Sequence, residues 1–196
     1  MGGMTEARPE QRRVTISDPQ VMRALAHPAR MAIMEHLSTV EGGATATECA
    51  EIAGLSPSAT SYHLRELAKF GLIEEAPSRG DARERVWRAF SPSYYIETGQ
   101  DADSEAHAAE LALVDAHLAR DSQRARDWIR RAPDEPPDWY QAAWFSDSLL
   151  QVTADELAEL NQAVQALMNP YRRRLRSDPP EGSRTVAVQY RALPID

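Results

Sequence analysis

The side chains with the most evident chemistry lie between residues 56 and 70, where small hydroxyl, aromatic and basic residues alternate. Four of them would share one face of a helix, at positions i, i+3, i+4 and i+7: Ser58, Ser61, Tyr62 and Arg65. Small hydroxyl groups let a helix backbone approach base edges closely, and an arginine reaches a guanine edge or a phosphate. This set, the recognition stripe, predicts a surface that contacts nucleic acid. An ordinary solvated helix face is the alternative.

Two further features extend this surface. Ser56-Pro57 is typical of a helix start, whose free backbone N–H groups can bind a phosphate. Downstream, four arginines fall within ten positions and suit contacts with a DNA backbone: Arg79, Arg83, Arg85 and Arg88. Ion pairs with Asp81 and Glu84 are the alternative for these arginines. We predict DNA contacts at Ser56, Ser58, Thr60, Ser61, Tyr62, His63, Arg65, Arg79, Arg83 and Arg85.

The elements that must position this surface are predicted within residues 18–92. Three proline-containing pairs mark helix starts: Asp18-Pro19, His27-Pro28 and Ser56-Pro57. A short third helix spans Thr45 to Ala53 and closes at Gly54. Two strand-like runs, Leu72 to Glu75 and Arg85 to Phe90, predict a hairpin. Two helices joined by a short turn and followed by a hairpin have the order of a winged helix-turn-helix domain.

Two segments at matching separation resemble the ArsR-type bacterial repressors. They are Ala24 to Ile33, ALAHPARMAI, and Leu55 to Leu67, LSPSATSYHLREL, the second continued by Phe70 to Ile73. Taken together, the resemblance covers residues 20–92. It implies a homodimeric transcription factor that binds a short inverted repeat, usually as a repressor, and an effector or signal that relieves binding.

The chain departs from the metal-sensing members of that family. Those members carry a cysteine pair on the helix before the recognition helix, whereas that helix here has Cys49 alone. We interpret Cys49 as a small core residue. Other members use Asp and His side chains on the dimer helix, but no complete ligand set can be aligned with the residues of that region: Asp103, His107, Asp115 and His117. We therefore predict no metal and no other cofactor.

Residues 102–131 are predicted to form one long helix. Its apolar positions follow steps of three and four, interrupted by Asp121; this dimer stripe comprises Leu111, Val114, Leu118, Ala125 and Trp128. A single apolar stripe beside a small domain needs a partner, and a second copy of the chain is the economical one. We predict a homodimer through this stripe, aided by a first helix at residues 18–26. Two copies of residues 56–70 would then meet successive major grooves, about 34 Å apart.

Five aromatic residues gather within 18 positions around a proline-rich break at residues 133–137: Trp128, Trp139, Tyr140, Trp144 and Phe145. They would line a pocket for an apolar effector, or form a core that joins the tail to the dimer helix. Beyond them we predict a strand over Ala142 to Val152, a helix opened by the capping box at Thr153 to Glu156, and a strand at Val186 to Tyr190.

Composition excludes several classes of protein. The chain has 196 residues and a net charge of −8. Residues 1–92 hold 11 basic and 12 acidic side chains, and residues 93–196 hold 11 and 18. The acidic excess therefore lies in the second half and leaves room for a basic face in the first. One cysteine allows no internal disulfide. The sequence has neither an apolar run long enough for a membrane helix nor a signal peptide, so we expect a cytoplasmic protein.

We predict a mainly α (α+β) fold with three regions: a flexible tail over residues 1–17, the winged helix-turn-helix over 18–92, and the dimer helix with a small α+β extension over 93–196. Residues 93–196 have no glycine-rich phosphate loop, and their two histidines, His107 and His117, have no nucleophile beside them. We therefore predict no enzyme activity. The predicted function is that of a homodimeric DNA-binding repressor with a non-metal effector. The alternative is a winged-helix module that binds protein instead of DNA.

Overall fold

The computed structural model describes residues 14–78, 84–91, 94–96, 99–173, 176 and 178–195. The chain divides into two compact units, Met1–His117 and Leu118–Asp196. The long helix α5 (Ser104–Arg131) begins in the first unit and ends in the second. Most of the predicted tail lies outside the described residues, and its last residues, Val14–Ile16, form strand β1.

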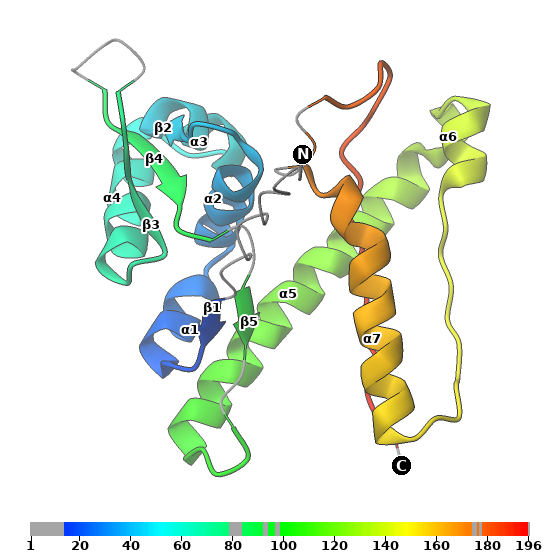
Figure 1. Ribbon diagram of the computed structural model, residues 1–196. Helices are drawn as coiled ribbons and strands as arrows, with labels where there is room; N and C mark the ends of the chain where they lie inside the picture. Colours follow the sequence, from blue (N-terminus) through cyan, green and yellow to red (C-terminus); the bar gives the residue numbers. More distant parts are fainter. Residues whose placement is uncertain are drawn as a thin grey trace, which may run out of the picture. The chain divides into compact units, whose positions relative to one another are not determined.

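Four helices follow in the first unit (Figure 1): α1 (Pro19–Leu25), α2 (Pro28–Thr39), α3 (Ala46–Ala53) and α4 (Pro57–Lys69). The three predicted proline starts are confirmed. In each, the preceding side chain accepts a hydrogen bond from the backbone of the first turn, at Asp18, His27 and Ser56. These caps satisfy N–H groups that would otherwise lack an acceptor within the helix.

A turn of three residues joins α3 to α4 and sets the angle between them. Helix α3 starts with a capping box in which Thr45 and Glu48 exchange hydrogen bonds. It ends at Gly54, whose φ of +65° is a left-handed conformation that suits glycine. Ser56 then caps α4. The local sequence therefore fixes both ends of α3 and the start of α4.

A three-stranded antiparallel sheet forms the wing, with the order β2 (Ala44–Thr45), β4 (Val86–Ala89) and β3 (Ile73–Ala76). The predicted hairpin is confirmed as β3 and β4. Gly43, before β2, has a φ of +82°, and a Cβ there would lie 2.3 Å from the carbonyl oxygen of Trp87. Only glycine lets β2 approach β4 this closely. Strand β1 pairs in parallel with β5 (Tyr94–Ile96).

The core of the first unit joins all four helices to the sheet and to the start of α5. Its fully buried side chains include Met22, Leu25, Ile33, Leu37, Cys49, Leu64, Leu67 and Leu113. Leu113 lies on the third turn of α5, so the beginning of this helix is an integral part of the first unit. Burying such a side chain contributes about 1.5–3 kcal/mol.

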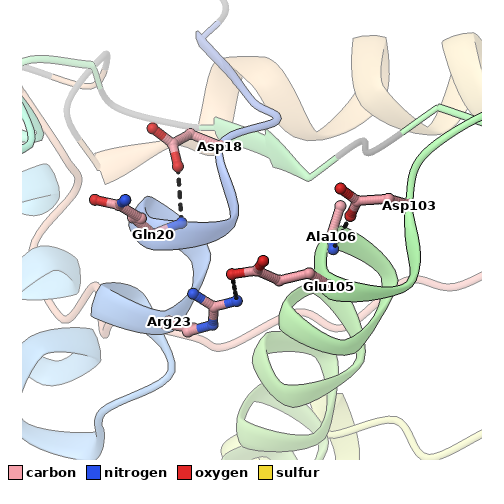
Figure 2. Close-up of polar contacts among 6 residues, drawn as sticks. All are labelled: Asp18, Gln20, Arg23, Asp103, Glu105 and Ala106. Carbon is pink, nitrogen blue, oxygen red and sulfur yellow. Dashed lines mark hydrogen bonds and ion pairs between the residues drawn. The ribbon is translucent and has the colours of Figure 1, made fainter.

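Polar contacts also hold α5 against α1 (Figure 2). The Arg23 guanidinium lies 2.5 Å from a carboxylate oxygen of Glu105. Asp103 caps α5 by accepting a hydrogen bond of 2.8 Å from the backbone N–H of Ala106. The predicted helix over 102–131 is thus confirmed, with its first turns fixed to the winged-helix unit.

The second unit contains α6 (Pro137–Ala142) and α7 (Ala154–Met168), with short 3-10 turns at Ala132–Asp134 and Asn169–Tyr171. The predicted capping box before α7 is confirmed, since Thr153 and Glu156 exchange hydrogen bonds. The two strands predicted in this unit are wrong: the described residues of 142–152 and 184–195 include no strand. An alternating apolar pattern forms a strand only where a neighbouring strand supplies hydrogen bonds. The fold as a whole is the predicted winged helix-turn-helix with a long helix.

Candidate nucleic-acid interface

Helix α4 presents two faces of opposite character. Leu64 and Leu67 are fully buried against the other helices. On the other side, Ser58, Tyr62 and Arg65 are exposed, and Ser61 is partly exposed. The recognition stripe is therefore accessible along the length of the helix, as its periodicity predicted.

Thr60 does not belong to this surface. Its side chain is fully buried, so the predicted DNA contact at this position is wrong. Thr60 lies four residues before Leu64 on the same face of α4, and that face packs into the core. A hydroxyl group in the sequence cannot by itself distinguish these two faces.

His63 lies at the contact between α4 and the start of α2. Its ring centroid is 4.7 Å from that of His27, whose Nδ1 caps α2. Desolvation, the neighbouring His27 and the cation of Arg30 together lower the pKa of His63. Desolvation and Arg30 likewise lower the pKa of His27. Both histidines therefore favour the neutral form, and His63, a predicted DNA contact, is half-buried.

A groove of about 330 Å³ lies beside the recognition stripe, between the start of α3, the middle of α4 and the wing. Its lining combines cationic, hydroxyl and aromatic side chains with one carboxylate: Thr45, Ala46, Thr47, Ser61, Arg65, Glu84, Arg85 and Trp87. Two arginines and two threonine hydroxyls around a helix start suit a phosphate group.

Sequence reasoning did not assign Thr47 to the interface, although it is exposed and lines this groove. The order of the elements could have indicated Thr47, because the first helix of a helix-turn-helix pair crosses the DNA backbone. The residues at the start of α3 were therefore candidates for phosphate contacts once α3 had been recognised as that helix.

The arginines of the hairpin divide into three groups. Arg79 and Arg83 lie outside the described residues. Arg85 is exposed beside the groove and lies 3.3 Å from a Glu75 carboxylate oxygen. Arg88 forms a cross-strand ion pair with Glu74, with an N···O distance of 2.7 Å. A carboxylate therefore partly offsets the charge of each described hairpin arginine.

The predicted dimer stripe continues along α5. Leu111, Val114 and Leu118 are exposed in the single chain, and Ala125 and Trp128 are partly exposed. This leaves an apolar surface on the helix that a partner could cover.

The aromatic cluster of the second unit does not close into a pocket. Trp144 and Phe145 are 87% and 90% exposed, and Tyr140 is exposed too. Trp128 and Trp139 are partly covered, each with a guanidinium over its ring, at 5.3 Å for Arg131 and 4.8 Å for Arg184. Within a single chain these residues form neither the enclosed effector pocket nor a core.

Cys49 is a core residue, as its sequence context predicted. It is fully buried, and desolvation together with Glu48 raises the pKa of its thiol to about 11. Such a thiol is inert at neutral pH. In the described part of the chain, no three His, Cys, Asp or Glu side chains group in a way that could hold a metal ion.

No helix among the described residues has the length and apolar character required to cross a bilayer.

One comparison with known protein families agrees with the helix-turn-helix geometry of α3 and α4. Residues 25–76 match a family described as a helix-turn-helix domain, a span that begins in α1 and ends with β3. This match covers less than half of the chain and does not single out the ArsR type. No curated protein matches the chain in sequence.

Solved structures resemble the chain only distantly. A MarR family transcription regulator is 17% identical, with 78% of this chain and 76% of that chain covered and a TM-score of 0.33. The apo form of a Lactococcus lactis ZitR mutant is 16% identical, with 74% and 83% covered and a TM-score of 0.33. A Mycobacterium tuberculosis MarR family protein in complex with salicylic acid is 19% identical, with 77% and 87% covered and a TM-score of 0.29. The assignment of a winged helix-turn-helix domain therefore rests on the elements described above and on the family match, and it supports a DNA-binding regulator.

Proposed function

We propose that this protein is a homodimeric, sequence-specific transcriptional regulator that represses by binding an inverted-repeat operator. The observation that carries the proposal is the recognition stripe of α4, which is exposed beside a groove lined by Arg65 and Arg85. In a helix-turn-helix protein the second helix of the pair enters the major groove. In this chain that helix is α4.

Each part of the interface has a distinct role in this proposal. Ser58, Ser61 and Tyr62 face the base edges, and Arg65 reaches a guanine or a phosphate. The groove beside α4, with Thr47 and Arg85, holds a backbone phosphate and fixes the depth of α4 in the major groove. Arg79 and Arg83 remain proposed backbone contacts.

The dimer is proposed to form through the dimer stripe of α5. The exposed apolar side chains of Leu111, Val114 and Leu118 support it. Because the first turns of α5 are packed into the winged-helix unit, a contact between two α5 helices would hold both copies of α4 at a defined spacing. Such spacing is what an inverted repeat requires.

We further propose that a small non-metal effector releases the operator. The partly covered rings of Trp128 and Trp139 are the proposed anchors for it, together with Tyr140. This part of the proposal is tested by screening apolar ligands for dissociation of the DNA complex.

The direct test is fluorescence anisotropy with duplexes tiled across the DNA upstream of the gene, repeated over a salt series. We expect one tile to bind at least about a thousandfold more tightly than the others. The affinity for it should fall steeply with salt because several phosphates are contacted. Arg85→Ala should weaken binding to every duplex alike and lower the salt slope by about 1.

Equal and weak binding to all tiles, with no preferred sequence elsewhere in a random duplex library, would contradict sequence-specific recognition. That outcome would favour the alternative, a winged-helix module that binds protein.

A further inference from the structure

The second unit of the chain has almost no core of its own. Among its described residues only Ala132 is buried, although the unit carries many leucine, valine and aromatic side chains. Soluble monomers rarely leave a large contiguous apolar surface in water. The unit therefore needs a partner surface.

Residues 143–152, which we call the connecting arm, lie between α6 and α7 (Figure 1). Its apolar residues are all exposed: Trp144, Phe145, Leu149, Leu150 and Val152. Within the described part of the chain, residues 144–152 make no backbone hydrogen bond. An extended apolar segment with free N–H and C=O groups is suited to pair with another strand.

Residues 184–191 form a second extended segment of the same unit, and ion pairs hold both of its ends. Arg184 bonds Glu135 at 2.5 Å, and Arg191 forms an ion pair with Asp121. Seven residues of extended chain span about 23 Å, and the 14 residues from Asp121 to Glu135 span a similar length as a helix, about 21 Å. Residues 184–191 therefore run antiparallel to the end of α5.

The free side of that segment is apolar. Val186, Val188 and Tyr190 alternate along it and are exposed, and residues 184–191 make no backbone hydrogen bond within the described part of the chain. We call these three residues the C-terminal row. One chain thus offers two unpaired extended segments, the arm and the segment that bears the row, which are not paired with each other.

The charges of the two regions are complementary. Residues 134–159, which contain the connecting arm, carry seven carboxylates and no basic side chain. Residues 160–191, which contain the C-terminal row, carry six arginines and two carboxylates. Arg184 and Arg191, which flank the row, are already paired within the chain, so the complementary charge comes from the arginines of residues 172–176. A second copy supplies this charge, whereas DNA or an anionic lipid surface would repel the acidic arm.

The available area also fits such a partner. Two large aromatic side chains that bury 150–250 Å² each, three aliphatic residues of the arm and the C-terminal row give on the order of 800 Å² per copy. That area is typical of one side of a stable protein–protein interface.

We propose that the connecting arm of one copy packs on the C-terminal row of a second copy, where it adds a strand to residues 184–191, and that the second copy reciprocates. The inference rests on the proposed homodimer and extends it, because it assigns the second unit, and not the α5 stripe alone, to the interface.

The test is photo-crosslinking of the full chain, with benzoylphenylalanine in place of Trp144. We expect a covalent product of twice the chain mass, whose cross-linked peptide includes residues 184–195 of the partner copy. The same photoreactive residue in place of Phe90, which is exposed in the first unit, should give at least about tenfold less of this product, since two copies must touch at the site for it to form. A cross-link only within one chain, or none, overturns the arm exchange.

A double substitution provides the second measurement. Trp144→Ser with Phe145→Ser should weaken dimerisation at least about tenfold in light scattering over a dilution series, since hot-spot aromatics dominate such interfaces. Ile52→Ser, an exposed apolar residue of α3, should leave dimerisation unchanged. A double variant that dimerises as tightly as the parent contradicts the exchange, while operator binding measured separately decides the proposed function.

Discussion

In the first unit, apolar side chains from α1 to α4, the wing and the start of α5 converge on one core, whereas in the second unit they face solvent. The two regions have similar fractions of hydrophobic residues and share one continuous helix, so hydrophobicity alone does not separate them. They differ in closure: the first unit surrounds most of its leucines, whereas the described leucines of the second unit are exposed or partly exposed. The geometry of the exposed face of α4 is therefore fixed within one chain, whereas most apolar side chains of the second unit stay exposed in it.

The comparison is tested most strongly by removing one leucine side chain from each region. Leu37 is 1% exposed, so Leu37→Ala should lower the free energy of unfolding by about 2–5 kcal/mol, through lost burial and the cavity that it leaves. Leu193 is 75% exposed and lies outside the connecting arm, so Leu193→Ala should change the free energy of unfolding by less than about 0.5 kcal/mol. Urea denaturation of both variants measures the difference, and similar losses would erase the distinction between the regions.

Two neighbouring glycines probe how tightly the wing is built. Gly42 and Gly43 both have positive φ, but only at Gly43 would a Cβ collide with the backbone of Trp87. We expect Gly43→Ala to destabilise the protein by about 1–3 kcal/mol more than Gly42→Ala, because the clash adds to the shared conformational strain. Thermal denaturation of the pair isolates the clash. Equal midpoints would mean that β2 is free to move away from β4.

The histidine pair predicts a pH dependence in the first unit. Folding lowers the pKa values of His27 and His63, so the unfolded chain binds more protons near and below pH 6.5, the ordinary value for histidine. Stability should therefore be complete above about pH 7 and decrease as the pH falls through 6.5. His63→Gln should flatten this dependence in urea titrations between pH 5 and pH 8. A stability that rises toward pH 5 would have the wrong sign.

The smallest expected effect is that of the ion pair between α1 and α5. Arg23 and Glu105 are both about half exposed or more, so solvent screens the pair, and Arg23→Ala should cost less than about 1 kcal/mol. A double-mutant cycle with Glu105→Ala measures the coupling directly. A coupling above about 2 kcal/mol would show that α5 depends on this pair rather than on buried Leu113.

Much of the first unit could be predicted because its signals are local. The proline starts and the turn at Gly54 each specify a backbone geometry within a few residues, as the capping box at Thr153 does in the second unit. The recognition stripe followed from helical periodicity. The predicted contact at Thr60 is wrong because it followed from the hydroxyl group, whereas the same periodicity places Thr60 with Leu64 and Leu67 on the buried face of α4.

The second unit shows where local signals fail. The alternation around Val186 and Val188 predicts a strand, but a strand needs a neighbour that one chain does not provide. The pairing of Arg85 with Glu75 depends on the register of β3 against β4. Such contacts arise between distant residues and leave no signature in the sequence near either one.

The central claim is that α4 reads DNA sequence, and the most direct measurement is the ratio of affinities for the operator and a scrambled duplex of the same length. In anisotropy titrations at one salt concentration, Arg65→Ala should reduce this ratio by about 10- to 100-fold, since a base contact contributes about 1–3 kcal/mol of discrimination. Arg88→Ala, which removes an arginine already paired with Glu74, should leave the ratio unchanged. An unchanged ratio for Arg65→Ala, with binding to both duplexes weakened equally, would contradict base reading by this helix.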